Sequence, residues 1–172
     1  MSSERGAGCA LLFALVGGCA SAPCTQVETI AVRLQPRAQL NQDRDGYARS
    51  VVLRLYQLDA AEPFRAVDFD ALWRTPDTAA PQKPVVAAPE QLTVIPGKRE
   101  ERTLARAPGA QFVAVVANFR EHEAGAGWRA IAPLPKPKHA CAAKVAPVAA
   151  RLSFELADYG LHLRGADQGD AR

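Results

Sequence analysis

The chain has 172 residues, a formal net charge of +3 at pH 7 and an apolar fraction of 48%. This length fits one domain with its own hydrophobic core and leaves no room for two large domains. The charged residues are spread along the sequence, which argues against nucleic-acid binding because that function calls for a concentrated basic face.

An apolar run near the N-terminus, from Ala10 to Val16, ends at two glycines and Cys19. A membrane-spanning helix takes about 20 apolar residues, so this run is too short to cross a bilayer but suits a secretory signal. Because small residues precede Cys19, the segment resembles a bacterial lipobox. We expect a signal peptide at 1–18, lipidation of Cys19, and an acylated tether at 19–26. The alternatives are an ordinary secretory leader or a buried strand.

Two further cysteines, Cys24 and Cys141, would remain in the exported protein, in an oxidising compartment where disulfides persist. A bridge between them would close a very long loop, for which chain-entropy models give a stabilisation of about 4 to 5 kcal/mol. The alternative is a pair of free thiols. The separation of the two Cα atoms decides between these states.

The first two predicted strands flank a long polar connection. Val27–Leu34 and Ser50–Leu58 both show the alternation of a half-buried strand. Between them, Gln35–Arg49 is rich in turn-forming Asn, Asp and Gly. A tight hairpin needs far fewer residues, and long connections in compact domains are often functional. We therefore regard this connection as a candidate binding element.

The middle of the chain combines a short helix with charged and proline-rich segments. Asp68 stands at an N-cap position before one or two helical turns that end near Arg74. Four prolines then exclude a long helix or a central strand over Thr75–Pro89. A short strand at Leu92–Val94 follows, and the charged segment Lys98–Leu104 is typical of an exposed edge strand.

The C-terminal half is predicted to consist of strands, of which the first is apolar on both faces and should be central. These strands are Phe112–Phe119, Trp128–Ala132, Val148–Leu156 and Leu161–Arg164. About eight short strands and one small helical insert predict an all-β fold, a two-sheet antiparallel β-sandwich. We expect this domain to span residues 27–165, followed by a C-terminal tail at 166–172.

Catalytic and metal-binding motifs are missing from the sequence. His122, His139 and His162 are scattered without HExxH spacing, and neither a G-x-S-x-G motif nor a glycine-rich phosphate loop occurs. The pair His139 and Cys141 falls short of a zinc signature. We expect no enzyme activity, no cofactor and no metal.

Several separated segments carry a resemblance to a known family. They are the lipobox at Cys19, the loop Asn41–Gly46 before the strand 50–58, the insert with Phe64, Asp68-Phe69 and Leu72-Trp73, the tripeptide Ile95-Pro96-Gly97, and Val113–Arg120 followed by Trp128-Arg129. In this order they resemble the outer-membrane lipoproteins of the bacterial type VI secretion system, the TssJ family.

The resemblance implies a transthyretin-like sandwich with a structural role. The acylated cysteine would hold the protein on the periplasmic face of the outer membrane, where the domain would bind the periplasmic C-terminal domain of the inner-membrane TssM protein. The family's contact loop corresponds to Gln35–Arg49. The partner-binding residues that this implies are Leu40, Asn41, Asp43, Asp45 and Gly46.

Three arginines in the same loop, Arg37, Arg44 and Arg49, leave the charge of the partner's surface open. Two other functions also remain as alternatives. One is an envelope sandwich lipoprotein that binds a carbohydrate or peptide, which a concave, aromatic-lined pocket would favour. The other is a transthyretin-like hydrolase, although the chain lacks the Tyr-Arg-Gly-Ser tail of such enzymes.

Overall fold

The computed structural model describes residues 29–74, 83–121, 127–135 and 149–168, which form eight strands and two short helices. In chain order these are β1 (Thr29–Pro36), β2 (Val51–Leu58), α1 (Ala61–Arg65), α2 (Phe69–Arg74), β3 (Glu90–Val94), β4 (Glu100–Ala105), β5 (Phe112–Asn118), β6 (Arg129–Pro133), β7 (Ala150–Ala157) and β8 (Gly160–Gln168). The predicted all-β fold is confirmed. Cys19, Cys24 and Cys141 lie outside the described residues.

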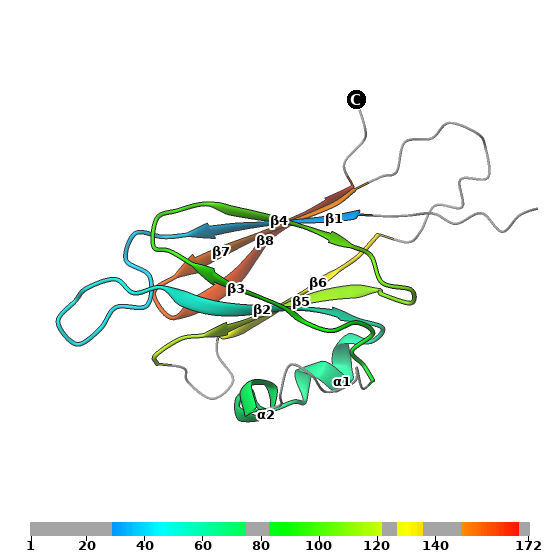
Figure 1. Ribbon diagram of the computed structural model, residues 1–172, viewed down its shortest axis with the longest axis horizontal. Helices are drawn as coiled ribbons and strands as arrows, with labels where there is room; N and C mark the ends of the chain where they lie inside the picture. The colour runs from blue at the N-terminus through cyan, green and yellow to red at the C-terminus, as the bar shows by residue number, and fades with distance from the viewer. Residues whose placement is uncertain (1–28, 75–82, 122–126, 136–148, 169–172) are drawn as a thin grey trace, which may run out of the picture.

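The strands form two four-stranded sheets, ordered β4-β1-β7-β8 and β3-β2-β5-β6, which stack as the layers of a sandwich (Figure 1). Every neighbouring pair is antiparallel except β1 and β7, which run parallel. The expected sandwich is therefore antiparallel with one parallel pair. A parallel pair needs a long crossover, and β1 and β7 are separated by most of the chain.

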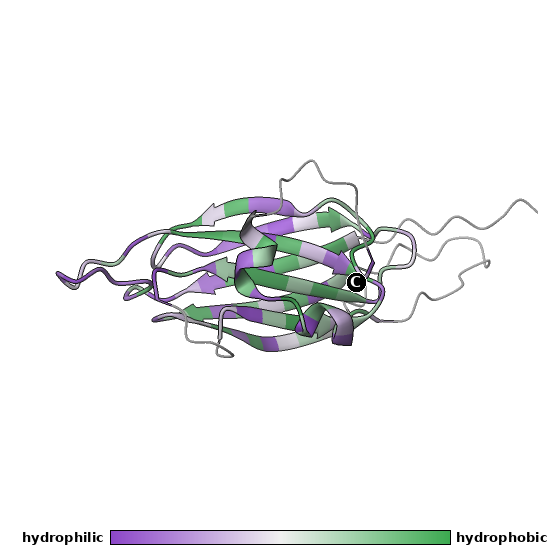
Figure 2. Cartoon of the chain, turned by 90° about the horizontal axis from the view of Figure 1, so that it is seen from below, coloured by the Kyte–Doolittle hydropathy of each residue, from purple (hydrophilic) through white to green (hydrophobic). Residues whose placement is uncertain are grey.

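The two sheets differ in how their outer faces are covered. Strand β7 alternates buried and more exposed residues, because one face packs in the core and the other meets solvent. In β5, by contrast, the five consecutive residues from Val113 to Ala117 are all buried. The helices α1 and α2 cover the outer face of the β3-β2-β5-β6 sheet, as Figure 2 shows from below. The prediction that β5 is central is confirmed.

An arginine on β2 joins this helical cover to the sheet. Arg54 is 7% exposed, and its Nη1 donates to the Leu72 carbonyl at 2.5 Å while its Nε donates to Gln91 Oε1 at 3.2 Å. Its guanidinium lies 4.6 Å from the centroid of the Trp73 ring. A buried charge requires such partners. The outward-facing arginine of β2 is therefore a packing residue of the helical insert.

A second arginine, Arg129 on β6, holds the C-terminal end of α1. Its guanidinium donates to the carbonyls of Phe64 at 3.1 Å and Val67 at 2.6 Å, and also to that of Arg65. A cation suits the carbonyls at a helix C-terminus. The same guanidinium lies 4.4 Å from the centroid of the buried Trp128 ring. Two arginines thus fix the insert on one sheet.

The structure also corrects the predicted helices and strand ends. The helix near residues 68–74 is present as α2, and α1, which contains Pro63, is a second short helix that the sequence did not predict. Proline is tolerated in the first turn of a helix, because N–H groups there make no hydrogen bond within the helix. Strand β1 continues to Pro36 because Gln35 and Pro36 pair with β7. Strand β8 likewise runs to Gln168.

Candidate partner-binding surface

The connection from β1 to β2, residues 37–50, projects from one end of the sandwich (Figure 1). Figure 2 shows that it is largely hydrophilic. The turn between β3 and β4, the residues that follow β5 and the turn between β7 and β8 lie beside its base, as the hydrogen bonds below establish. We call residues 37–50, 95–99 and 120–121 together the loop end.

The base of the loop is buried. Leu40 is fully buried in the core, and Asn41 is only 2% exposed. The Asn41 side chain donates from Nδ2 to the Ser50 carbonyl at 3.1 Å and accepts the Arg120 N–H at Oδ1 at 2.8 Å. Its backbone N–H donates to the Asp158 carbonyl at 2.7 Å. One residue therefore ties the loop to both sheets.

Asn41 also has a backbone conformation that few residues adopt readily. Its φ is 51°, in the left-handed region, where asparagine is among the better tolerated non-glycine residues. The Tyr159 hydroxyl adds a further tie by donating to the carbonyl of the next residue, Gln42, at 2.7 Å. The loop consequently leaves the sandwich in a defined direction.

A single carboxylate organises the rest of the loop. Asp43 Oδ1 accepts the N–H groups of Asp45 at 3.0 Å and Tyr47 at 2.9 Å. Its Oδ2 accepts from Arg49 Nε at 2.7 Å and Nη2 at 2.5 Å. The hydrogen bond from Arg49 is the largest cause that lowers the pKa of Asp43 below its ordinary value. The Asp43 carboxylate is therefore paired with groups of the loop itself.

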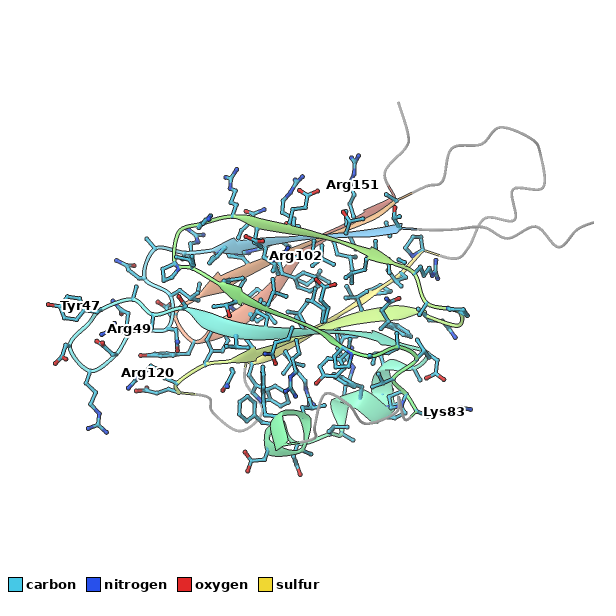
Figure 3. All side chains as sticks on the ribbon, in the orientation of Figure 1. Tyr47, Arg49, Lys83, Arg102, Arg120 and Arg151 are labelled. Carbon is cyan, nitrogen blue, oxygen red and sulfur yellow. The ribbon has the colours of Figure 1, made fainter. Side chains whose placement is uncertain are left out.

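The tip of the loop presents different groups to solvent. Gly46 has a φ of 82° and donates its N–H to the Asp43 carbonyl at 3.0 Å, a turn that suits glycine. Asp45 is exposed beside it, and the Tyr47 side chain is 66% exposed. The Arg49 guanidinium lies 5.9 Å from the centroid of the Tyr47 ring. Figure 3 labels both side chains at this end of the molecule.

The segments beside the loop extend this surface. The Gly97 N–H donates to the Arg37 carbonyl at 3.2 Å, which brings the turn after β3 against the start of the loop. Ile95 in that turn is 50% exposed. Arg120, whose backbone N–H binds Asn41, has an exposed side chain and is labelled in Figure 3. The loop end thus combines apolar and cationic groups.

The five residues predicted to bind the partner occupy three kinds of position. Leu40 and Asn41 are buried, and Asp45 and Gly46 lie at the tip. The Asp43 side chain accepts hydrogen bonds from other residues of the loop. Their part in binding stays a prediction. Sequence reasoning did not select Tyr47, although a lone aromatic residue among the polar residues 41–50 is a signal that could have found it.

A concave region lies on the outer face of the β4-β1-β7-β8 sheet. This hollow of about 190 Å³ is lined by Ala31, Arg33, Glu101, Arg151, Leu152, Ser153 and Gly165. Arg33 and Glu101 form an ion pair across it at 3.2 Å. The lining contains no aromatic ring, so the hollow does not favour the carbohydrate-binding alternative.

The described ranges contain no group of three or more His, Cys, Asp or Glu side chains that could hold a metal ion. The same part of the chain has no helix with the length and apolar character required to span a membrane.

Comparison with known proteins gives a family and a fold. The family model described as "Type VI secretion lipoprotein, VasD, EvfM, TssJ, VC_A0113" matches residues 28–159. The solved structure of the lipoprotein TssJ1 from Pseudomonas aeruginosa is similar, with 20% identity, a TM-score of 0.64, and coverage of 82% of this chain and 99% of that chain. None of the curated proteins matches.

Two further solved structures are similar. Serratia marcescens Lip, described as a membrane-bound component of the type VI secretion system, has 18% identity and a TM-score of 0.65, with coverage of 81% of this chain and 97% of that one. A chain in the structure described as "T6SS protein TssM C-terminal domain (869-1107) from EAEC" has 21% identity and a TM-score of 0.62, with coverage of 80% and 98%. Since the family model spans most of the chain, the protein belongs to the type VI secretion lipoprotein family that includes TssJ.

Proposed function

We propose that the chain is an outer-membrane-anchored structural lipoprotein of the type VI secretion system that binds the periplasmic C-terminal domain of an inner-membrane TssM protein. The observation that carries the proposal is the loop 37–50, whose base and interior are fixed by hydrogen bonds within the chain. A loop that is ordered before binding loses less conformational entropy when it binds.

The comparisons support TssM as the partner to test. One similar chain belongs to the structure described by the TssM C-terminal domain, and another belongs to the structure described as "Type VI membrane complex", with 22% identity and a TM-score of 0.64. These descriptions concern other proteins. They indicate that chains of this fold are found in structures of that machinery.

The direction of β1 supports an anchor on one membrane and a partner on the other. Thr29 begins the strand a short distance in sequence after Cys19, and Pro36 leads directly into the loop. Eight residues of strand separate the two ends by roughly 25 Å. The chain therefore enters β1 at one end and leaves it for the loop 37–50 at the other. Multiple acyl chains are needed for a stable anchor.

The test has two arms. The full chain, expressed with its leader, should fractionate with the outer membrane and incorporate labelled lipid, whereas Cys19→Ser should be released as a folded protein. The released form should co-purify with the TssM periplasmic domain of the same organism. Failure of the wild-type chain to bind that domain would contradict the proposed function. Unchanged fractionation of Cys19→Ser would contradict the anchor alone.

We also propose that Cys24 and Cys141 are bridged in the exported protein. Mass spectrometry without reductant should then find a linked peptide pair, and reduction should lower the unfolding midpoint. Two freely alkylated thiols in periplasmic material would show that the bridge does not form.

A further inference from the structure

Two exposed apolar side chains belong to the loop end. Among the described residues, the exposed large hydrophobic side chains are Tyr47, Ile95 and Leu163, and the first two belong to this surface. Val51, at the start of β2, pairs with Val94, so Ile95 follows directly at the edge from which the loop projects. Exposed aromatic residues that become buried are frequent anchors of protein interfaces.

Tyr47 is exposed but its backbone is held on both sides. Its N–H donates to Asp43 Oδ1 at 2.9 Å, and its carbonyl accepts the Asp43 N–H at 2.9 Å. Asp43 is itself held by two hydrogen bonds from Arg49. A tyrosine on a fixed backbone supplies a large contact area at a low entropy cost. The backbone that carries the ring is thus fixed by hydrogen bonds within the loop.

Outside its ion pairs, the loop end carries a small excess of positive charge. Arg49 pairs with Asp43 and Arg37 pairs with Glu155, so both arginines are already neutralised. With the neighbouring turn residue Asp158 included, four basic and three acidic side chains of the loop end then remain. Arg44 and Arg120 are exposed, and neither forms an ion pair with another residue in the described part of the chain. Their guanidinium groups are free to bind carboxylates in bidentate fashion.

We propose that the loop end recognises an acidic protein surface that contains an apolar pocket for the Tyr47 ring, with carboxylates at its rim that pair with Arg44 and Arg120. This inference rests on the proposed function, since it specifies the surface of the partner that the loop would contact. It resolves the sign of the partner's charge, which the mixture of arginines and aspartates in the loop sequence leaves open.

Anionic lipid headgroups would also attract these arginines. The geometry favours a protein, because hydrogen bonds fix the loop at its base and around Asp43. A tyrosine on a fixed backbone also suits a pocket of fixed shape better than a fluid surface. Lipid binding is therefore an outcome of the test.

The test measures binding of the TssM periplasmic domain to the chain carrying Cys19→Ser, by calorimetry and surface plasmon resonance at several salt concentrations. Tyr47→Ala should weaken binding by about 30-fold, the size expected for an interface hot spot. Tyr47→Phe should bind within about threefold of the parent, because the ring is kept. The double variant Arg44→Glu, Arg120→Glu should slow association and reduce its dependence on salt.

Matched controls lie elsewhere on the sandwich. Arg151→Glu changes the charge of an exposed arginine on β7, and Leu163→Ala removes an exposed apolar side chain on β8. Both should bind like the parent chain. Each variant replaces an exposed residue, so an unchanged unfolding midpoint is expected and should be verified for every one.

The outcomes separate this inference from the proposed function. If the parent binds the domain but Tyr47→Ala and the double variant bind equally well, the inference is wrong and the proposed function stands. Tighter binding of the double variant would show that the partner's surface is basic, which also overturns the inference. If the parent binds phosphatidylglycerol vesicles and not the domain, both proposals fail.

Discussion

The base and the tip of the loop 37–50 differ in the partners of their polar groups. At the base, Leu40 and Asn41 are buried, and the Asn41 side chain bonds with the backbone of other segments. At the tip, Arg44, Asp45 and Tyr47 face solvent. A binding loop can thus combine residues that position it with residues that are available to a partner. Substitutions in the two regions should therefore separate stability from affinity.

The largest effect on stability is expected at Leu40, which is fully buried. Leu40→Ala should lower the free energy of unfolding by about 3 kcal/mol, since it removes apolar contacts and leaves a cavity. Chemical denaturation measures this change. Affinity for the TssM domain should fall only as far as the loop becomes disordered. A variant as stable as the wild type would show that Leu40 is not part of the core.

Asn41→Ala should cost about 2 kcal/mol, because it removes two side-chain hydrogen bonds and places a Cβ-bearing residue without them at positive φ. Asn41→Gly is the matched control, since it relieves the backbone conformation and loses the same hydrogen bonds. The glycine variant should unfold at a higher denaturant concentration than the alanine variant. Equal midpoints would mean that backbone conformation contributes nothing at this site.

Asp43→Asn should leave the unfolding midpoint close to that of the wild type, because the carboxylate organises an exposed loop and no part of the core. Without the carboxylate the tip of the loop would be less ordered, and it would have to become ordered when the partner binds. We expect roughly tenfold weaker binding to the TssM domain from that added entropy cost. Faster amide exchange at residues 45 and 47 should accompany the loss. Full affinity with unchanged exchange would contradict the role assigned to Asp43.

The smallest effect concerns pH. Glu155 on β7 accepts from Arg164 and from Arg37, the first residue of the loop, each at 2.7 Å. The Arg164 hydrogen bond, followed by that of Arg37, lowers the pKa of Glu155 from 4.5 to about 2. Because the folded state has the lower pKa, this contribution is present above about pH 4.5 and is lost as the pH falls toward 2.

Unfolding curves for the wild type and Glu155→Gln between pH 7 and pH 2 measure that contribution. The variant should be slightly less stable at neutral pH, and the difference should vanish near pH 2. A difference that does not depend on pH would show that the Glu155 carboxylate interacts equally in the folded and unfolded states.

Periodicity in the sequence was sufficient to predict the strands, because alternation and burial are local properties of a sandwich. Helix α1 was not predicted, because its five residues are too few to show helical periodicity and include Pro63, which a helix tolerates in its first turn. Nothing in the sequence around Arg54 indicates that this arginine is buried beneath the helices α1 and α2.

The division of roles within the loop could not be predicted. Asn41 has the composition of a solvated turn residue, and its burial depends on Arg120, which is 79 positions away. The loop's second tie, between Gln42 and Tyr159, spans 117 positions. Contacts of that range are properties of the assembled sandwich. Leu40 and Asn41 were consequently grouped with the exposed residues of the same segment.

The most direct test of the central claim exchanges residues 43–47 for a Gly/Ser segment of equal length and keeps Leu40 and Asn41 in place. The exchange keeps the loop length, on which the closure free energy depends, and leaves the core unchanged, so the unfolding curve should resemble that of the wild type. Calorimetry with the TssM periplasmic domain should then detect no binding, while the wild type binds. Wild-type affinity in the exchanged chain would contradict the account, because the loop would not be the surface that the partner recognises.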